Sequence, residues 1–463
     1  MHDFINTIAL KCLPVSLLRK RFTKSTQVCN SQVCSPQVNS VKQLLVDVST
    51  IAKEDAGTGI QRVVRNLYQE LLAAPPAGYQ ILPIAATRKQ GYSYLPQDFL
   101  HQPIKNKVST SLVPATLDPV KVSAGDLFLG LDLAAHIVPH RIADLLRWRR
   151  QGIRVSFVVY DLLPVLEPTW FNPKTTQNFK RWLRAIAILA DDVIAISRTV
   201  KNDFSACMKH TYGVDGLDLP CTAIPLGAEI KNINNNQPAA DHKIHLPPQL
   251  VDKKFILMVG TIEPRKGHAD VLDAIEPLWA ADKQVLLVIA GKQGWRVEPL
   301  IQRIQTHIEV GKQLHWLNNP SDDVLLALYQ NCSGLIMASK GEGFGLPLIE
   351  AAYFNKPILA RDIPVFREIV GNSANYFTAT GHNSLLNALP QWLLRLESKN
   401  NMPVIYPIWG TWQESCAQLI KALFPAIPAI PAIPAILDKR NQEPSLALAQ
   451  SYSTQPTAIN KTL

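Results

Sequence analysis

The segment S-K-G-E-G-F-G-L-P-L-I-E, residues 339–350, sets two carboxylates eight positions apart around a glycine-rich turn. It follows the apolar run G-L-I-M-A-S and continues into P-L-I-E-A-A-Y-F, an order that predicts a buried strand, a turn and a helix. Gly343 and Gly345 allow a tight turn whose N–H groups approach a ligand closely, and Pro347 suits the start of the helix. The segment therefore predicts an anion cradle at a helix N-terminus in a parallel α/β domain.

Both carboxylates of this segment are expected to face one ligand. Glu342 precedes the turn, and Glu350 lies about one helical turn into the helix, with its side chain directed back toward the helix start. Carboxylates accept hydrogen bonds from hydroxyl groups, so the pattern suits a phosphate with a polyol on each side. A nucleotide-diphosphate sugar fits that description. The alternative is a pair of solvated charges beside an ordinary glycine turn.

The segment resembles the E-x7-E signature of retaining GT-B glycosyltransferases of family four. V-G-T-I-E-P-R-K-G at residues 259–267 is similar to the phosphate-binding turn of the same family, and it also stands between an apolar strand run and a helix. The resemblance covers about residues 43–424. It implies an α/β GT-B fold, with two doubly wound, Rossmann-like domains that face each other across a cleft.

The resemblance implies a role for each matching residue. Lys266 would neutralise the diphosphate leaving group with Arg265 as a helper, although an arginine here can equally hold a structural carboxylate. Glu342 would hold the sugar hydroxyls and Glu350 the ribose, while Thr261 stands where the family often has an arginine. The donor-binding residues are then Gly59, Arg265, Lys266, Glu342, Gly343, Phe344, Gly345, Leu346 and Glu350, and the catalytic residues are Glu342, Lys266 and Asp161.

Two segments of the N-terminal half carry the remaining site predictions. G-T-G-I-Q-R at residues 57–62 resembles the glycine loop that approaches the donor phosphate in this family, with a simple helix-start turn as the alternative. Its third glycine position is Arg62 and no acidic residue ends the next strand, which disfavours a dinucleotide-binding enzyme. In V-Y-D-L-L-P at residues 159–164, Asp161 either contacts substrate or caps its loop, and Tyr160 would hydrogen-bond the sugar.

The length of 463 residues and the 47% hydrophobic composition predict two or three domains. Strand and helix patterns alternate in two series separated by a polar stretch, which indicates two parallel sheets covered by helices. A P-A-I repeat begins at Pro425 and favours an extended spacer. The predicted divisions are a disordered basic extension (1–40), an N-terminal acceptor domain (41–230), a linker (231–252), a C-terminal nucleotide-sugar donor domain (253–408), an amphipathic helix (409–424) and a proline-rich spacer with a disordered tail (425–463).

The net charge of +10 favours anionic partners, and no recognisable module points to nucleic acid. Basic and aromatic residues of the first half, such as Arg149 and Trp182, suit a polyprenyl-diphosphate acceptor or a peripheral membrane contact, with a solvated helix face as the alternative. Seven scattered cysteines and the lack of a signal peptide or membrane span predict a reduced, cytoplasmic protein. Metal-dependent sugar transferases of the other major fold usually carry an Asp-x-Asp metal motif, and no such triplet ends a strand here. We therefore expect neither a metal nor a cofactor.

The identity of the transferred sugar and the type of reaction are suggested by resemblance alone. A-G-K-Q-G-W at residues 290–295 and T-G-I-Q-R-V-V-R at residues 58–65 look most like bacterial mannosyl- or rhamnosyltransferases of surface polysaccharide assembly. The expected reaction is transfer of a hexosyl group from a nucleotide-diphosphate sugar to a glycan or polyprenyl-linked glycan, with retention of anomeric configuration. A GT-B hydrolase or epimerase acting on a nucleotide sugar and a non-catalytic sugar-nucleotide-binding scaffold are the alternatives.

Overall fold

The structure is a computed structural model, and it describes residues 13–19, 41–100, 118–227, 246–397 and 410–425. The chain separates into two units, and all of these residues belong to the first, residues 1–427. Most of the predicted extension, most of the predicted linker and the predicted tail from residue 426 lie outside the described residues. Within the extension, residues 15–19 form a helical turn with Val15 and Leu18 buried, so the prediction of disorder is wrong for this short part.

The N-terminal half of the described chain forms a seven-stranded sheet, in the order β3-β2-β1-β4-β5-β6-β7. Neighbouring strands are parallel except β2 and β3, which pair antiparallel. The central strands are buried on both faces, as expected of a parallel sheet covered by helices. The strands are β1 (Lys42–Asp47), β2 (Tyr79–Ala85), β3 (Ser93–Tyr94), β4 (Leu127–Gly130), β5 (Arg154–Val159), β6 (Asp192–Ala195) and β7 (Cys221–Ala223).

Helix α3 (Gly59–Ala73) shows how the sequence specifies these elements. Thr58 forms a capping box with Gln61, which satisfies N–H groups at the start of the helix. Apolar residues recur at helical spacing, and the buried ones are Val63, Val64, Leu67 and Leu71. The other α-helices of this half are α4 (Ile142–Arg150), α5 (Leu163–Leu166), α6 (Pro173–Leu189) and α7 (Arg198–Cys207).

The C-terminal half forms a six-stranded parallel sheet in the order β10-β9-β8-β11-β12-β13. This order is that of a doubly wound fold, and it reverses between β8 and β11. The strands are β8 (Phe255–Val259), β9 (Leu286–Ala290), β10 (Leu314–Leu317), β11 (Gly334–Met337), β12 (Ile358–Arg361) and β13 (Asn375–Phe377). The helices are α8 (His268–Ala280), α9 (Glu298–Thr306), α10 (Asp322–Asn331), α11 (Leu346–Tyr353), α12 (Pro364–Val370) and α13 (Leu385–Glu397).

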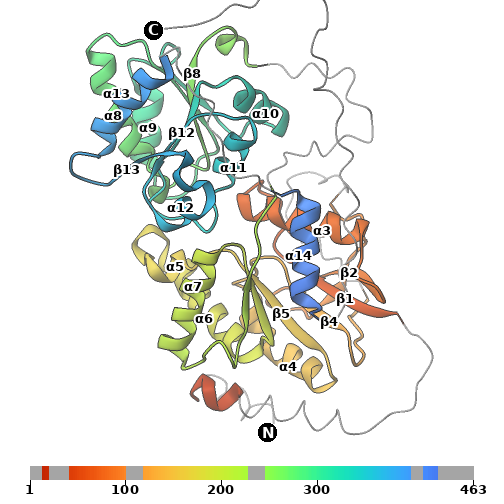
Figure 1. The fold of residues 1–463 in the computed structure, drawn as a ribbon. Coiled ribbons are helices and arrows are strands. Elements are labelled where there is room, and N and C mark those ends of the chain that lie inside the picture. Colours follow the sequence, from red (N-terminus) through yellow and green to blue (C-terminus); the bar gives the residue numbers. More distant parts are fainter. Residues whose placement is uncertain (1–12, 20–40, 101–117, 228–245, 398–409, 426–463) are drawn as a thin grey trace, which may run out of the picture. The chain divides into compact units, whose positions relative to one another are not determined.

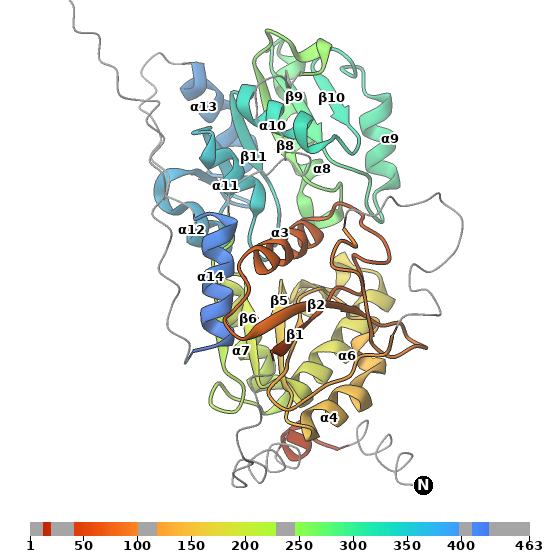
Figure 2. The ribbon, with the colours of Figure 1, turned by 90° about the vertical axis from the view of Figure 1, so that its right-hand side faces the viewer.

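Helix α14 (Trp412–Leu423) lies within the range predicted for the last amphipathic helix. Thr411 caps it in a capping box with Glu414. The helix packs on α3, next to which it lies in Figures 1 and 2. Arg154 of β5 donates to the carbonyl oxygen of Leu423 at 2.6 Å. The last helix therefore packs on elements of the N-terminal half, although it follows the second sheet in the sequence.

Candidate functional site

The two motifs of the C-terminal half follow neighbouring strands at their carboxyl ends. The turn at residues 260–267 follows β8, and the segment at residues 339–350 follows β11. These two strands pair with each other where the strand order of the sheet reverses. Open α/β sheets bind their ligands at such a switch point. The topology therefore brings together the residues predicted to bind the donor.

Lys266 and Arg265 both hold the carboxylate of Glu342. Lys266 Nζ lies 2.5 Å from Oε1 of Glu342, and Arg265 Nη1 donates to Oε2 at 2.8 Å. Burial alone would raise the pKa of Glu342, but the charges of Lys266 and Arg265 lower it to about 2. Arg265 Nε also lies 3.0 Å from Oε2 of Glu263. Arg265 thus holds a second carboxylate besides the predicted site residue, and Glu342 is ionised at neutral pH.

Asp161 joins this charged cluster from the N-terminal half. It follows β5, and its half-buried side chain accepts a hydrogen bond from the N–H of Leu163 at 3.1 Å, which caps the loop. Burial raises the pKa of Asp161, and the charges of Arg265 and Lys266 partly offset that effect. Two cations, Lys266 and Arg265, therefore interact here with three carboxylates, those of Glu342, Glu263 and Asp161. Among the described residues, no group of His, Cys, Asp or Glu side chains is arranged to hold a metal ion.

Gly343 marks a close approach between the segment at residues 339–350 and the loop after β5. A Cβ atom on Gly343 would lie 1.8 Å from the carbonyl oxygen of Tyr160 and 3.2 Å from the Cβ atom of Asp161. Any other residue would clash there, so the position requires glycine. Ser197, which caps α7, donates its hydroxyl to the carbonyl oxygen of Gly343 at 2.8 Å. These contacts hold the turn beside Asp161.

Glu350 is buried in α11, and both of its carboxylate oxygens are engaged. Arg62 Nη1 donates to Oε1 at 2.5 Å, and the Tyr329 hydroxyl donates to Oε2 at 2.6 Å. Arg62 lies in α3 and Tyr329 in α10. The sequence patterns identified Arg62 only as a departure from a dinucleotide fingerprint and gave no indication of Tyr329. The sequence contained one indication that Arg62 could belong to the site: it is a cation in the first turn of a helix that follows a glycine loop.

The turn between Glu342 and α11, which we predict to be an anion cradle, leads directly into the N-terminus of the helix. Gly345 has a φ of 104°, in the left-handed region that favours glycine, and it stands directly before the helix. A Cβ atom on Gly59 would lie 3.9 Å from Cδ1 of Leu346, the first residue of the helix, and Phe344 is buried. The N–H groups of a helix start attract anions. The structure thus places Gly59 beside the glycine-rich turn.

One prediction about the N-terminal half is wrong, and a second holds only in part. The Tyr160 hydroxyl is buried and donates to the carbonyl oxygen of Leu131 at 2.6 Å, so it does not face a sugar. The predicted basic face is only partly present: Trp182 and Arg149 are buried, and Arg149 pairs with Asp191 at 2.5 Å. Arg147, Arg150, Lys180 and Arg181 are exposed, as predicted. The helical patterns were right, but a long amphipathic side chain at such a position can pack inward. Across the described ranges, no helix is both long and apolar enough to span a bilayer.

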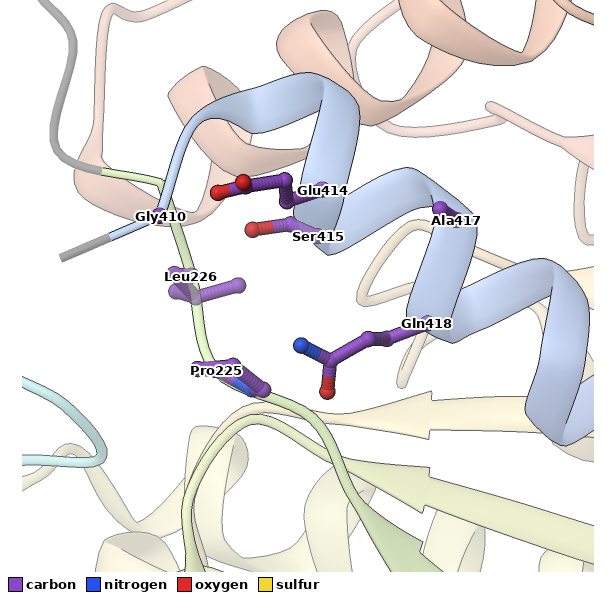
Figure 3. A pocket seen from close by; sticks show the side chains of 7 residues that line it. All are labelled: Pro225, Leu226, Gly410, Glu414, Ser415, Ala417 and Gln418. Atoms are coloured by element: carbon purple, nitrogen blue, oxygen red, sulfur yellow. The ribbon is translucent and has the colours of Figure 1, made fainter. Parts of the chain in front are cut away.

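A cavity of about 520 Å³ lies beside α14, away from these residues (Figure 3). Figure 3 shows Glu414 and Gln418 extending from the helix, with Pro225 and Leu226 on the facing segment. Glu414 uses its carboxylate to accept from the N–H of Thr411 at 2.8 Å, within the cap of the helix. The complete lining is Pro225, Leu226, Gly410, Glu414, Ser415, Ala417 and Gln418. Because it contains none of the predicted donor-binding residues, we do not assign the donor site to this cavity.

Comparisons with known proteins relate the chain to glycosyltransferases. Residues 243–403 match the family described as "Glycosyl transferases group 1". The chain is 36% identical over 385 residues to a serotype-specific mannosyltransferase WbdA of Escherichia coli, which covers 82% of this chain and 46% of the relative. It is 26% identical over 239 residues to the O-antigen chain mannosyltransferase RfbU of Salmonella typhimurium, covering 50% of this chain and 59% of the relative. The chain thus spans about half the length of these relatives.

Solved structures show a similar fold at low sequence identity. HepE of Anabaena, in complex with UDP and glucose, aligns with a TM-score of 0.52 at 15% identity, over 83% of this chain and 98% of HepE. A sucrose-phosphate synthase of Thermosynechococcus elongatus aligns with a TM-score of 0.50 at 16% identity, over 83% and 95% of the two chains. Together with the two Rossmann-like sheets, these similarities confirm the predicted GT-B fold.

Proposed function

We propose that the chain, whose residues 243–403 match the glycosyl transferases group 1 family, moves a hexosyl group from a nucleotide-diphosphate sugar to a glycan or lipid-linked glycan. The observation that carries the proposal is the pairing of Lys266 and Arg265 with Glu342 at the switch point of the second sheet. Cations beside a helix start suit a diphosphate, and the nearby carboxylates suit hydroxyl groups. Mannose is the hexose that we favour over rhamnose, because the relatives named above are mannosyltransferases.

In the proposed reaction, the anomeric configuration of the sugar is retained. The bond between the anomeric carbon and the diphosphate oxygen breaks, and the acceptor oxygen bonds to the same face of the sugar. The acceptor proton passes to the departing phosphate oxygen, so the step needs no separate strong base. Lys266 and the N–H groups of residues 343–346 would stabilise the charge that develops on the leaving group.

The ion pairs of Lys266 and Arg265 with Glu342 are compatible with binding of a diphosphate and transfer of its sugar. A diphosphate competes with Glu342 for the ammonium group of Lys266, and taking over that cation would leave Oε1 of Glu342 able to accept from a sugar hydroxyl. Arg265 would stay on Oε2 and keep the carboxylate ionised and oriented. Asp161 comes from the N-terminal half, and we assign it to hydrogen bonding with the acceptor hydroxyl or the transferred sugar.

A donor screen with product analysis tests the proposal. The full chain would be incubated with GDP-, UDP- and dTDP-hexoses and with mannose-terminated glycans, followed by mass spectrometry and by NMR of the new linkage. We expect transfer with retention from one class of donor, and loss of transfer in Lys266→Ala. The exposed Lys283→Ala serves as a control for the loss of a cation. Hydrolysis without transfer, or nucleotide binding without turnover, would reject the transferase in favour of one of the two alternatives.

A further inference from the structure

Basic side chains gather at the carboxyl edge of the N-terminal sheet. We refer to five of them as the basic surface: Lys53, Arg88, His136, His140 and Arg181. Lys53 follows β1, Arg88 follows β2, and the two histidines follow β4. All are exposed except His136, which is half-buried. None of them takes part in the donor site proposed above.

Hydrogen bonds and electrostatic effects show that these groups lie close together. Arg88 Nε donates to the carbonyl oxygen of His136 at 3.1 Å, and Arg141 Nη2 donates to the carbonyl oxygen of Arg88 at 3.1 Å. Burial lowers the pKa of His136, and the charges of Arg88, Lys53 and His140 lower it further. His140 responds in the same way to burial and to its cationic neighbours. Charges act on a neighbouring imidazole in this way only over a short distance.

The basic surface has no carboxylate partner among the described residues. In those ranges, no ion pair joins it to an acidic side chain, whereas the adjacent Arg141 pairs with Asp144 at 3.3 Å. Asp132, which precedes the histidines in the sequence, is buried and hydrogen-bonds to backbone groups instead of to the basic surface. Its Oδ2 atom accepts from the N–H groups of Thr50 and Ile51, each at 2.7 Å. Positive charges gathered without a counter-charge attract anionic ligands.

The basic surface and Asp161 lie at the same edge of the N-terminal sheet. β1 and β4 pair where the strand order of the N-terminal sheet reverses, the place at which such sheets bind ligands. β5, which leads to Asp161, pairs with β4 on the other side. Neighbouring strands lie about 5 Å apart, so the ends of β2 and β5 are on the order of 15 Å from each other. A short acceptor with its hydroxyl beside Asp161 can therefore reach the basic surface with its opposite end.

We propose that the basic surface binds the phosphate or diphosphate group of a phosphate-linked glycan acceptor. This inference rests on the proposed function and specifies the chemistry of the acceptor, namely a glycan whose reducing end carries a phosphate, as in a polyprenyl diphosphate. Arginine offers phosphate oxygens two parallel hydrogen bonds, and lysine adds a mobile positive charge. The anchored phosphate sets the distance at which the acceptor hydroxyl meets the donor sugar.

A matched pair of acceptors tests this inference. One is a short mannose-terminated glycan, and the other is the same glycan carrying a short-chain prenyl diphosphate. We expect the diphosphate to lower KM in the natural chain, and Lys53→Gln/Arg88→Gln to raise that KM about tenfold or more, with kcat little changed, because charged hydrogen bonds to phosphate are lost. Lys254→Gln/Lys283→Gln removes two exposed charges from the C-terminal half and should leave KM unchanged. Arg88→Lys keeps the charge without the hydrogen bond to His136, so it should largely preserve the low KM.

Direct binding separates failure of this inference from failure of the proposed function. Binding of a fluorescent prenyl-diphosphate glycan needs no turnover, and we expect Lys53→Gln/Arg88→Gln to weaken it while nucleoside diphosphate affinity stays unchanged. Equal binding of this probe by the natural chain and the double variant would overturn the inference, even if transfer is observed. So would equal affinity for the two glycans, or a loss confined to binding of phosphatidylglycerol vesicles, since that loss would assign the surface to a membrane. Equal effects of Arg88→Lys and Arg88→Gln would reduce Arg88 to a structural role.

Discussion

Arg62 donates a hydrogen bond to Glu350 at 2.5 Å, although the two residues stand 288 positions apart in the chain. The Glu350 side chain is only 4% exposed, and Tyr329 occupies its second oxygen. Glu350 is the carboxylate that we assign to the ribose of the donor. A ribose hydroxyl must therefore share this carboxylate with Arg62 or displace it. Binding of a nucleotide and the contact between α3 and α11 are linked through one acceptor group.

Removal of this arginine should strengthen nucleotide binding while weakening the fold. Arg62→Gln leaves a buried carboxylate without its cation, which costs about 3 kcal/mol of folding stability. Ribose hydroxyls can then supply the missing hydrogen bonds, so we expect a lower melting temperature together with a severalfold lower Kd for nucleoside diphosphate. Calorimetry and thermal melts measure the two effects. The control is Arg65→Gln in the same helix, which breaks an ion pair with Asp55. Weaker nucleotide binding in Arg62→Gln would mean that Arg62 itself contacts the donor phosphates.

Loss of Lys266 should act mainly on the chemical step. Lys266→Ala removes one preorganised cation from the leaving group, and removal of such a donor typically lowers kcat by about 100- to 1,000-fold. The variant also takes one of two cations from Glu342, so a modest loss of stability accompanies the kinetic effect. Single-turnover kinetics with a saturating donor provide the measurement. Turnover close to that of the natural chain would remove Lys266 from the mechanism.

The two carboxylates should differ in which kinetic quantity they affect. A ribose contact is equally useful in the ground and transition states, so Glu350→Gln should mainly weaken nucleotide binding. A contact with the transferred sugar changes during reaction, so Glu342→Gln should mainly lower kcat. Nucleoside diphosphate affinity and kcat would be compared in both variants. Equal losses of affinity would contradict this division of roles.

The central part of the site could be predicted because it is local in sequence and in topology. Lys266 and Glu342 each lie in a glycine-containing turn after an apolar strand run, and the carboxyl ends of parallel strands share one edge of a sheet. Those two facts suffice to bring the residues together. The pairing of Arg62 with Glu350 could not be predicted, because it depends on how α3 packs against the second half of the chain. No periodicity in a single sequence encodes such a contact.

The sequence patterns also could not predict the direction in which a side chain points at the end of a strand. Asp161 and Tyr160 are neighbours at the end of β5, and both are polar enough to suggest a site. The structure turns the Tyr160 hydroxyl inward to the carbonyl oxygen of Leu131, while Asp161 interacts with Lys266 and Arg265. Successive side chains of an extended segment point in opposite directions, so one of two neighbours faces inward. The sequence does not show which of the two faces inward, because tyrosine combines a large apolar ring with a polar hydroxyl group and suits either environment.

Two buried carboxyl groups should each contribute more to the stability of the fold near pH 5 than near pH 8. Burial raises the pKa of Asp47 to about 6 and that of Asp132 to about 7, both from a usual value near 3.8. Between about pH 4 and pH 7 the folded chain binds more protons at these groups than the unfolded chain, so its stability falls as pH rises. Melting temperatures from pH 5 to pH 8 show the slope. Asp132→Asn should flatten it, and an unchanged slope in that variant would exclude Asp132 as a source.

The last helix should be required for the fold, and the chain beyond it should not. A chain that ends at residue 425 keeps α14 intact, and we expect it to retain its melting temperature and its transfer activity. A chain that ends at residue 410 loses the buried side chains of Trp412, Leu419 and Leu423, each worth about 1.5–3 kcal/mol, and uncovers α3. We expect that truncation to melt at a much lower temperature or to aggregate.

A point variant separates the packing of this helix from the simple loss of chain. Trp412→Ala leaves the length unchanged but opens a cavity where the ring is 1% exposed, which costs about 3–5 kcal/mol. Gln413→Ala, at the exposed neighbouring position, is the matched control and should melt like the natural chain. If the shorter truncation and Trp412→Ala both kept the natural melting temperature, α14 would contribute nothing to the fold. If the chain ending at residue 425 lost transfer, a role in activity would pass to the segment beyond it.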